Sequence, residues 1–259
     1  MPKHTIKLVA KKLIGPKTYL AIFKSSLIFE LEVGKLFSFL VADKTYRSYS
    51  LVDYGRTQMQ SFGFVLPDLN EDQIYLSFLI STKMGGVGSQ FFEKLELENE
   101  VIVVGPTGKF ALSQNLQTPK IFICTGTGIA PFYGMVKKAL TENALKNNLI
   151  EIKVLFGTDG GIKNWAVELF KPLLEKYANL ELHSCYWPDK ESLEITSKCE
   201  HNTTVTKLLP NIVKNHSEYE YYLCGNAFMI NDVKKELLEN CKVDSSNILQ
   251  ESFALPITK

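Results

Sequence analysis

The stretch Ile121-Phe122-Ile123-Cys124-Thr125-Gly126-Thr127-Gly128-Ile129-Ala130-Pro131 decides the fold of the second half of the chain. Ile121–Cys124 is a short apolar run, and Ile129–Leu140 follows it with the apolar spacing of a helix. Pro131 falls in the first helical turn, where proline is tolerated. Small residues at a strand–turn–helix junction let a pyrophosphate approach the helix N-terminus closely. We therefore predict a nucleotide site at Thr125, Gly126, Thr127 and Gly128. The alternative is a tight turn without a ligand.

Downstream of this junction, strand patterns and helix patterns alternate. The expected strands are Ile152–Phe156, Leu180–Tyr186 and Tyr221–Cys224, and the expected helices are Trp165–Glu175, Thr204–Leu209 and Met229–Leu238. In the last helix Met229, Val233 and Leu237 recur every four residues, which indicates one buried stripe. Alternating strands and helices predict βαβ units, and therefore a parallel sheet of the Rossmann type.

Upstream of the junction the chain consists of short apolar segments separated by turn residues. The expected strands are Thr5–Ile14, Thr18–Phe23, Leu36–Ala42, Arg47–Val52, Ser61–Leu66, Gln73–Ser81, Val101–Val104 and Lys109–Leu112, with one helix at Ser89–Leu95. This spacing predicts an antiparallel β-barrel. The polar segment Ser113–Pro119 is the expected linker. The fold is therefore expected to have two domains, a barrel at residues 1–117 and an α/β domain at residues 118–259.

Composition excludes several classes of protein. The 259 residues carry a net charge of +1, which gives no electrostatic footprint for nucleic acid or a membrane surface. No stretch has the length of apolar residues that a membrane span needs. The five cysteines, Cys124, Cys185, Cys199, Cys224 and Cys241, form no Cys-x-x-Cys pair. We therefore expect no disulfide framework, no zinc or iron–sulfur site and no other metal, and a reducing, cytoplasmic location.

The segment Arg47-Ser48-Tyr49-Ser50 contains one of only two arginines in the chain. Arginine differs from lysine where a rigid fork of donors must hold a phosphate or carboxylate. Tyr49 and the serines add a flat ring and hydroxyl groups. These side chains suit a ligand with an anionic part and a flat, hydrogen-bonding part, such as a phosphorylated flavin. On a strand Arg47 and Tyr49 share one face, and Ser48 and Ser50 share the other. An ordinary exposed strand is the alternative.

The segment Met84-Gly85-Gly86-Val87-Gly88-Ser89 precedes the helix expected in the first domain. Glycines let successive N–H groups point into one concavity, and a helix start favours an anion. Gly86, Val87, Gly88 and Ser89 are thus candidates to hold a diphosphate. A flexible loop with Ser89 as N-cap is the alternative.

Two later segments complete the set of candidates. In Tyr221-Tyr222-Leu223-Cys224-Gly225-Asn226, Cys224 and Gly225 fall at the carboxyl end of an expected parallel strand, where open sheets bind ligands. No histidine stands beside Cys224 to make it a nucleophile. In the tail Gln250–Pro256, the aromatic Phe253 is either a final core residue or a mobile ring that stacks on a flat ligand.

The order of the segments RSYS, GGVGS, GPTGKF, GTGIAP, CGNAFM and ESF resembles the ferredoxin–NADP⁺ reductase superfamily, over about residues 5 to 253. The resemblance implies a flavin-binding β-barrel followed by an NAD(P)-binding α/β domain. It also implies hydride transfer from NAD(P)H to FAD, and then single electrons to a ferredoxin, a flavodoxin or another acceptor. Two alternatives stay open. One is the reductase component of a multi-protein oxygenase complex, and the other is a non-catalytic flavin or nucleotide sensor.

The resemblance implies a role for each candidate residue. Ser50, Cys224 and Glu251 would be catalytic. The FAD contacts would come from Arg47, Ser48, Tyr49, Ser50, Gly86, Val87, Gly88, Ser89 and Phe253, and the NAD(P) contacts from Thr125, Gly126, Thr127, Gly128, Asp159, Cys224 and Gly225. Relatives that use NADP often carry arginine where this chain has Thr158–Lys163, and an acid such as Asp159 suits a free ribose hydroxyl. NADH is therefore favoured, although Lys163 could bind a 2′-phosphate. The chain also continues past Phe253, which leaves its stacking on a flavin open.

Overall fold

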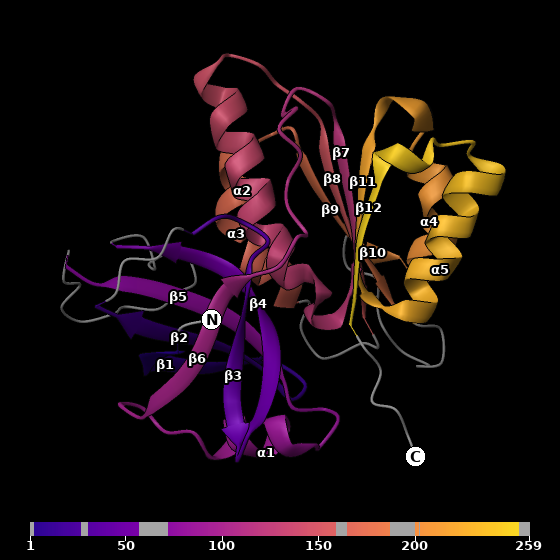
Figure 1. The fold of residues 1–259 in the computed structure, drawn as a ribbon. Helices are drawn as coiled ribbons and strands as arrows, with labels where there is room; N and C mark the ends of the chain where they lie inside the picture. The colour runs from indigo at the N-terminus through magenta and orange to yellow at the C-terminus, as the bar shows by residue number, and fades with distance from the viewer. Residues whose placement is uncertain are drawn as a thin grey trace. The chain divides into compact units, whose positions relative to one another are not determined.

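The structure is a computed structural model that describes residues 3–26, 31–56, 72–158, 165–186, 200–201 and 203–253. The chain divides into two compact units, Met1–Leu112 with Ala130–Met135, and Ser113–Ile129 with Val136–Lys259. The first is a β-barrel and the second an α/β unit, so the expected fold class is confirmed (Figure 1). The boundary after residue 117 stays a prediction. In the described part of the chain, no helix has the length and apolarity that crossing a membrane requires.

The barrel is a closed antiparallel sheet of six strands in the order β1-β2-β5-β4-β3-β6. The strands are β1 (Lys3–Gly15), β2 (Thr18–Ser25), β3 (Leu36–Ala42), β4 (Thr45–Gly55), β5 (Ile74–Ser81) and β6 (Glu100–Thr107). In β3, buried and partly buried residues alternate along the strand, which is the pattern of a sheet with one face toward a core. Four phenylalanines fill that core, namely Phe23, Phe37, Phe39 and Phe78.

The short helix α1 (Val87–Lys94) packs on this barrel. Its Phe92 is buried, and its ring centroid lies 5.3 Å from that of Phe39. The apolar side of α1 is therefore anchored in the barrel core.

The α/β unit contains a six-stranded parallel sheet in the order β10-β9-β8-β7-β11-β12. The strands are β7 (Lys120–Thr125), β8 (Ile152–Thr158), β9 (Leu180–Tyr186), β10 (Glu200–His201), β11 (Glu220–Asn226) and β12 (Ile248–Phe253). Helices α2 (Ala130–Leu145) and α3 (Trp165–Lys176) lie on one face, and α4 (Val205–Ile212) and α5 (Ala227–Lys235) lie on the other (Figure 1). Because both faces are covered, the central strands read as continuous apolar runs.

Shorter helical turns complete the unit. A 3₁₀ turn at Gly126–Ile129 leads into α2, and a π-helical turn at Glu236–Asn240 continues α5. Two more 3₁₀ turns lie at His216–Glu218 and Ser245–Asn247. The stripe predicted for the last helix is confirmed, since Val233 and Leu237 are fully buried and Met229 packs against the same cluster.

One expected strand is wrong, and one strand of the structure is not predicted. Lys109–Leu112 forms no strand, although its residues alternate. Phe110 is buried there and packs on Phe132 at 6.0 Å between ring centroids, so the alternation reflects one anchored ring instead of a ladder. The tail, for which no strand is predicted, forms β12, which pairs in parallel with β11. The expected strand Ser61–Leu66 lies outside the described residues.

The expected linker Ser113–Pro119 is tied to the α/β unit by a buried lysine. Lys120 is fully buried, and its Nζ donates to Glu220 Oε2 at 2.7 Å and to the Asn115 carbonyl at 2.8 Å. Burial lowers the Lys120 pKa, and the hydrogen bond and charge of Glu220 oppose that shift. Asn143 also donates to the Leu116 carbonyl at 2.7 Å. The segment is therefore pinned at several points, and Ser113–Pro119 belongs structurally to the second unit.

Candidate functional site

In the barrel, the arginine segment and the glycine segment meet at Gly88. A Cβ atom on Gly88 would lie 2.9 Å from Tyr49 Oη and 3.2 Å from Arg47 Cγ. Strand β4 carries Arg47 and Tyr49, and α1 carries Gly88. Glycine is required here because two side chains of β4 occupy the space that any other residue would fill. Two of the predicted FAD-binding segments therefore form one surface.

The Tyr49 ring is held in place by other aromatic rings. Its centroid lies 4.9 Å from that of Phe92 and 5.5 Å from that of Phe39, both in edge-on arrangements. Burial raises the pKa of Tyr49 to about 12, and the charge of Arg47 opposes that shift. Tyr49 is thus a neutral hydroxyl donor at physiological pH, on a ring with little freedom to move.

The other residues of the arginine segment lie as a strand predicts. Arg47 is exposed, and its Nη1 donates to the Tyr46 carbonyl at 2.8 Å. Ser48 Oγ shares a 2.8 Å hydrogen bond with Ser38 Oγ, on the opposite face from Arg47 and Tyr49. Ser50 is buried at 6% exposure and lies opposite Leu36 in the ladder. The structure thus brings Arg47 and Tyr49 to α1, but the Ser48 side chain faces away.

The glycine segment forms an open turn ahead of α1. Gly85 has φ of +63°, which favours glycine, and nothing lies within 4 Å of a Cβ built on Gly85 or Gly86. The helix begins at Val87 with Gly86 as N-cap, so the predicted start at Ser89 is wrong. Ser89 lies in the first turn and is buried, whereas Val87 is exposed. The free N–H groups at this end are those that an anion can use.

In the α/β unit, the turns after β7 and β11 interlock. A Cβ on Gly128 would lie 2.7 Å from the Cys224 carbonyl carbon and 2.9 Å from Gly225 Cα. Gly225 has φ of +132°, and a Cβ there would lie 2.5 Å from Thr125 Oγ1. The Asn226 N–H donates to Thr125 Oγ1 at 3.0 Å. Two of the predicted NAD(P)-binding segments therefore touch, backbone against backbone, at the carboxyl ends of adjacent parallel strands.

The sequence patterns do not single out Asn226 itself. Its side chain caps α5 by accepting the Phe228 N–H at 2.8 Å, while its own N–H binds Thr125. The available signal is an asparagine that directly precedes a helical pattern, which is a preferred N-cap. The Thr125 hydroxyl is correspondingly an acceptor within the protein, and Thr127 is half-buried in the same turn.

Cys124, Cys224 and Glu251 form a row across three strands. Cys224 lies opposite Cys124 on β7 and opposite Glu251 on β12. Both thiols are fully buried, and burial raises their pKa well above the usual value, with a further contribution from Glu251 for Cys224. These cysteines are therefore neutral thiols, which agrees with the absence of a histidine to activate Cys224.

Glu251 is the exceptional member of that row. Among the described residues, its buried Oε2 has no hydrogen-bond partner, and burial raises its carboxyl pKa. A buried carboxyl oxygen without a partner costs free energy, so Glu251 Oε2 is a candidate to bind a polar group of a ligand.

Two predicted residues have less defined places. Phe253 lies opposite Asn226 at the end of β12 and is half-buried. Its stacking on a flavin stays a prediction. Asp159 lies outside the described residues. In the described ranges, no group of three histidine, cysteine or acidic side chains could hold a metal ion.

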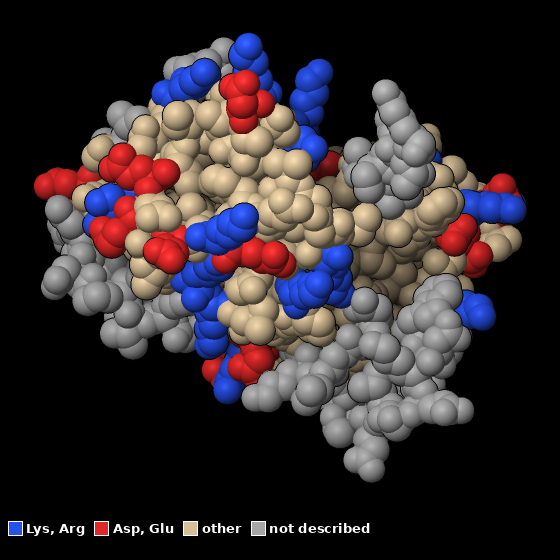
Figure 2. Space-filling model, turned by 90° about the horizontal axis from the view of Figure 1, so that it is seen from below, with Lys and Arg blue, Asp and Glu red and all other residues tan. Residues whose placement is uncertain are grey.

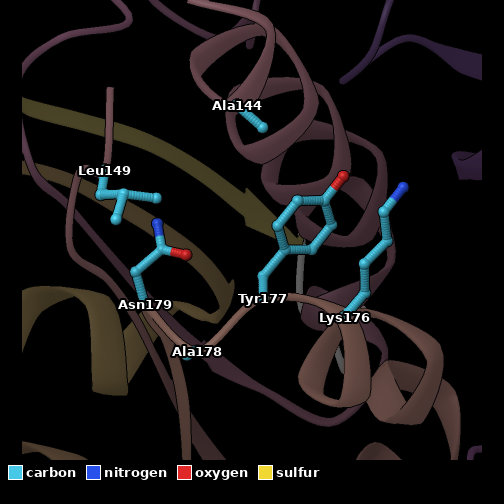
Figure 3. A pocket seen from close by; sticks show the side chains of 6 residues that line it. All are labelled: Ala144, Leu149, Lys176, Tyr177, Ala178 and Asn179. Carbon is cyan, nitrogen blue, oxygen red and sulfur yellow. The ribbon is translucent and has the colours of Figure 1, made fainter. Parts of the chain in front are cut away.

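A hollow of about 490 Å³ lies elsewhere in the α/β unit (Figure 3). Ala144, Leu149, Lys176, Tyr177, Ala178 and Asn179 line it, at the end of α2 and in the connections that precede β8 and β9. It is therefore at the amino end of the strands, opposite to the interlocked turns. Its polar groups are already paired, for example Asn179 Nδ2 with the Ile150 carbonyl at 2.5 Å. On the face shown in Figure 2, basic and acidic side chains are interspersed, in line with the small net charge.

Comparison with known proteins gives this arrangement a context. Residues 122–235 match the oxidoreductase NAD-binding domain family. Ferredoxin–NADP⁺ reductase from Plasmodium falciparum has a TM-score of 0.68 at 19% identity, over 97% of this chain and 96% of that one. The chain has the fold of ferredoxin–NADP⁺ reductase. The absence of the expected strand at Lys109–Leu112 and the presence of the strand β12, which is not predicted, do not change this fold.

Two curated relatives are more similar in sequence to this chain than the Plasmodium falciparum reductase is. The sulfite reductase [NADPH] flavoprotein alpha-component of Buchnera aphidicola is 30% identical over 173 residues, which are 65% of this chain and 27% of that protein. The anthranilate 1,2-dioxygenase electron transfer component of Acinetobacter baylyi is 25% identical over 184 residues, or 69% and 51% of the two chains. This chain thus spans between about a quarter and a half of the length of these relatives.

Proposed function

We propose that this chain is an NAD(P)H-dependent FAD oxidoreductase that delivers electrons to a protein acceptor. The observation that carries the proposal is the meeting of Gly88 with Arg47 and Tyr49. It puts an exposed guanidinium, a fixed phenol ring and the N-terminus of α1 on one surface of the barrel. This surface has the features that a phosphorylated flavin requires: an anion site and a flat ring beside it.

The barrel residues have separable tasks in this proposal. Arg47 and the N–H groups at Gly86–Ser89 bind the diphosphate, and the absence of a Cβ at Gly88 lets Arg47 and Tyr49 pack against the start of α1. Tyr49 packs against the flavin ring, since Phe39 and Phe92 hold its own ring in one orientation. Ser50 bonds near the reactive nitrogen. A bound flavin would accept a hydride from a reduced nicotinamide and release the electrons one at a time.

The α/β unit supplies the nicotinamide site. The turn at Thr125–Gly128 presents the N-terminus of α2 to a pyrophosphate, because the interlock with Gly225 and Asn226 fixes its backbone. Cys224 and Gly225 lie beside the nicotinamide. Glu251 Oε2, which has no partner among the described residues, accepts a polar hydrogen of the nucleotide or, when protonated, donates one. Asp159 is proposed to favour NADH by contact with a free ribose hydroxyl.

Anaerobic reduction tests the proposal. The purified protein should carry FAD, or take it up after reconstitution, and NADH should bleach the flavin band faster than NADPH does. Steady-state turnover with ferricyanide separates catalysis from sensing. A protein that cannot bind FAD contradicts the proposal, and bound FAD without turnover supports a sensor instead.

A second candidate is the reductase component of a multi-protein oxygenase. The similarity to an anthranilate dioxygenase electron transfer component favours it, because that relative serves such a complex by its name. The hydride chemistry is the same, and only the acceptor differs. Cytochrome c, a ferredoxin and a flavodoxin, offered separately to the NADH-reduced protein, would rank the acceptor classes by rate. The four described free cysteines agree with a reducing compartment such as the cytoplasm.

A further inference from the structure

Lys11, on β1, touches the far end of the helix that carries the proposed diphosphate site. Its Nζ donates to the carbonyls of Phe92 at 2.5 Å, Glu93 at 3.2 Å and Leu95 at 3.1 Å. Phe92 and Glu93 lie in the last turn of α1, and Leu95 is its C-cap. These carbonyls have no intrahelical donor, and they form the negative end of the helix. One ammonium group therefore binds three carbonyls at the C-terminus of α1.

The lysine is itself held in position. Its Nζ lies 4.9 Å from the centroid of the Tyr19 ring, and β1 pairs Lys11 with Ala21 of the barrel. Burial lowers the Lys11 pKa, while the nearby Glu93 opposes that shift. The ammonium is thus fixed to the barrel wall and exchanges part of its hydration for the three carbonyls. It therefore joins α1 to the barrel at a defined point.

The opposite end of α1 is held less firmly in the described part of the chain, where Gln90 Nε2 donates to the Gly85 carbonyl at 3.2 Å. Gly86 is the N-cap and makes no side-chain cap bond, and the turn at Gly85 and Gly86 is open. Between the two ends, Phe92 packs in the aromatic core and Gly88 rests on Tyr49 and Arg47. The helix has only eight residues, so a displacement of its last turn also displaces its first turn.

We propose that Lys11 is a positioning residue that sets the orientation of α1, and so places the N–H groups of Gly86–Ser89 to bind the FAD diphosphate. This inference rests on the proposed function of the barrel site. The effect is mainly geometric, because the ammonium lies roughly 12 Å along the helix from the anion, beyond the Debye length in physiological salt. Lys11 was not among the residues that the sequence motifs indicate.

Three variants test it. Lys11→Met removes the donors and keeps the length of the side chain, and Lys11→Arg keeps a cation with donors. Lys7→Met is the matched control, because Lys7 lies on the same strand β1 but pairs with the exposed Glu98 at 3.2 Å. For each apoprotein, the FAD dissociation constant is measured from the quenching of flavin fluorescence. Amide hydrogen exchange of residues 87–94 is measured without flavin.

The expected result is a roughly tenfold higher FAD dissociation constant for Lys11→Met, with faster exchange in α1 and unchanged exchange in the barrel strands. Lys11→Arg should restore α1 protection and most of the affinity, and Lys7→Met should change neither. Equal FAD affinity in Lys11→Met and wild type overturns the inference, as does weaker binding without faster exchange in α1. If Lys11→Met does not fold, Lys11→Arg decides, since unaltered exchange with greatly weakened binding would contradict the role. A wild-type protein that binds no FAD refutes the proposed function itself.

Discussion

The two candidate anion sites of this chain are built from different materials. In the barrel, Gly88 rests against the side chains of Arg47 and Tyr49. In the α/β unit, Gly128 and Gly225 rest against the backbone and the Thr125 side chain of interlocked turns. Both arginines of the sequence precede residue 57, so the second site uses none. Side chains can adjust to a disturbance through rotation, whereas packed backbone cannot, and the two sites should therefore respond differently to the same substitution.

Gly128→Ala should have the largest effect. The added methyl group would overlap the Cys224 carbonyl carbon and Gly225 Cα, at 2.7 Å and 2.9 Å, and neither atom can move without shifting a strand end. We expect the α/β unit to lose about 3 kcal/mol of stability by overpacking, and nucleotide binding to be lost. Urea unfolding followed by tryptophan fluorescence measures this, since both tryptophans, Trp165 and Trp187, follow residue 136. A variant as stable as wild type would show that the turns are not tightly interlocked.

The sequence predicts most of this framework because local patterns determine it. Leu36–Ala42 and Leu180–Tyr186 are predicted with the bounds that the structure has, since apolar alternation and an apolar run are local signals. Strand β12 cannot be found in this way. Ile248–Phe253 is a partly exposed edge strand, and it becomes a strand only through its pairing with β11. At Lys109–Leu112 the alternation is real, but it serves the single buried Phe110.

The same limit applies to the candidate site. Arg47, Gly88 and Gly128 are visible in the sequence because glycine and arginine have few structural substitutes. The contact of Lys11 with α1 joins residues 81 or more positions apart, so no local sequence pattern predicts it. Thr125 binding to the Asn226 N–H is likewise a contact between two distant turns. The roles assigned to Ser50, Cys224 and Glu251 stay predictions.

Gly88→Ala should have a smaller effect on stability and a larger one on flavin. The methyl group would meet Tyr49 Oη at 2.9 Å and Arg47 Cγ at 3.2 Å, so these two side chains would have to shift, but no strand backbone would. We expect a loss of about 1 kcal/mol in stability, but a clearly weaker FAD affinity, because the displaced side chains are the proposed ligands. Gly86→Ala adds a methyl group at the same proposed site without displacing Arg47 or Tyr49, since no atom lies within 4 Å of the added Cβ. FAD affinity in Gly88→Ala equal to that of wild type would argue against a site at this surface.

Arg47→Lys is a milder test of whether side chains bind the ligand in the barrel site. The substitution keeps the charge but removes the planar fork of donors. We expect the FAD dissociation constant to rise by roughly five- to tenfold, about 1 kcal/mol, with no change in thermal unfolding of the apoprotein. Arg56→Lys, at the other arginine, is the matched control and should leave binding unaltered. Titration of each apoprotein with FAD measures the difference, and unchanged FAD affinity in Arg47→Lys would remove Arg47 from the diphosphate site.

Glu251→Gln should have the smallest effect, and that effect should depend on pH. Burial raises the Glu251 pKa above its usual value of 4.5, so the folded protein holds this proton more tightly than the unfolded chain. Wild-type stability should therefore fall as pH rises from about 4.5 through the raised pKa, and the resulting penalty should be constant above it. Glutamine carries no titrating proton, so the stability of Glu251→Gln relative to wild type should increase over that window and then level off.

Urea unfolding at several pH values between 4 and 8 measures this difference. Glu239→Gln is the control, because its side chain is 63% exposed in the same unit. A stability difference between Glu251→Gln and wild type that stays constant or falls as pH rises would contradict the burial of Glu251. Added NADH should reduce the difference if the nucleotide supplies the missing partner of Oε2, because a hydrogen bond to the carboxylate stabilises its charged form. The Glu251 carboxyl would then be a side chain that senses the bound nucleotide in a site built mainly from packed backbone.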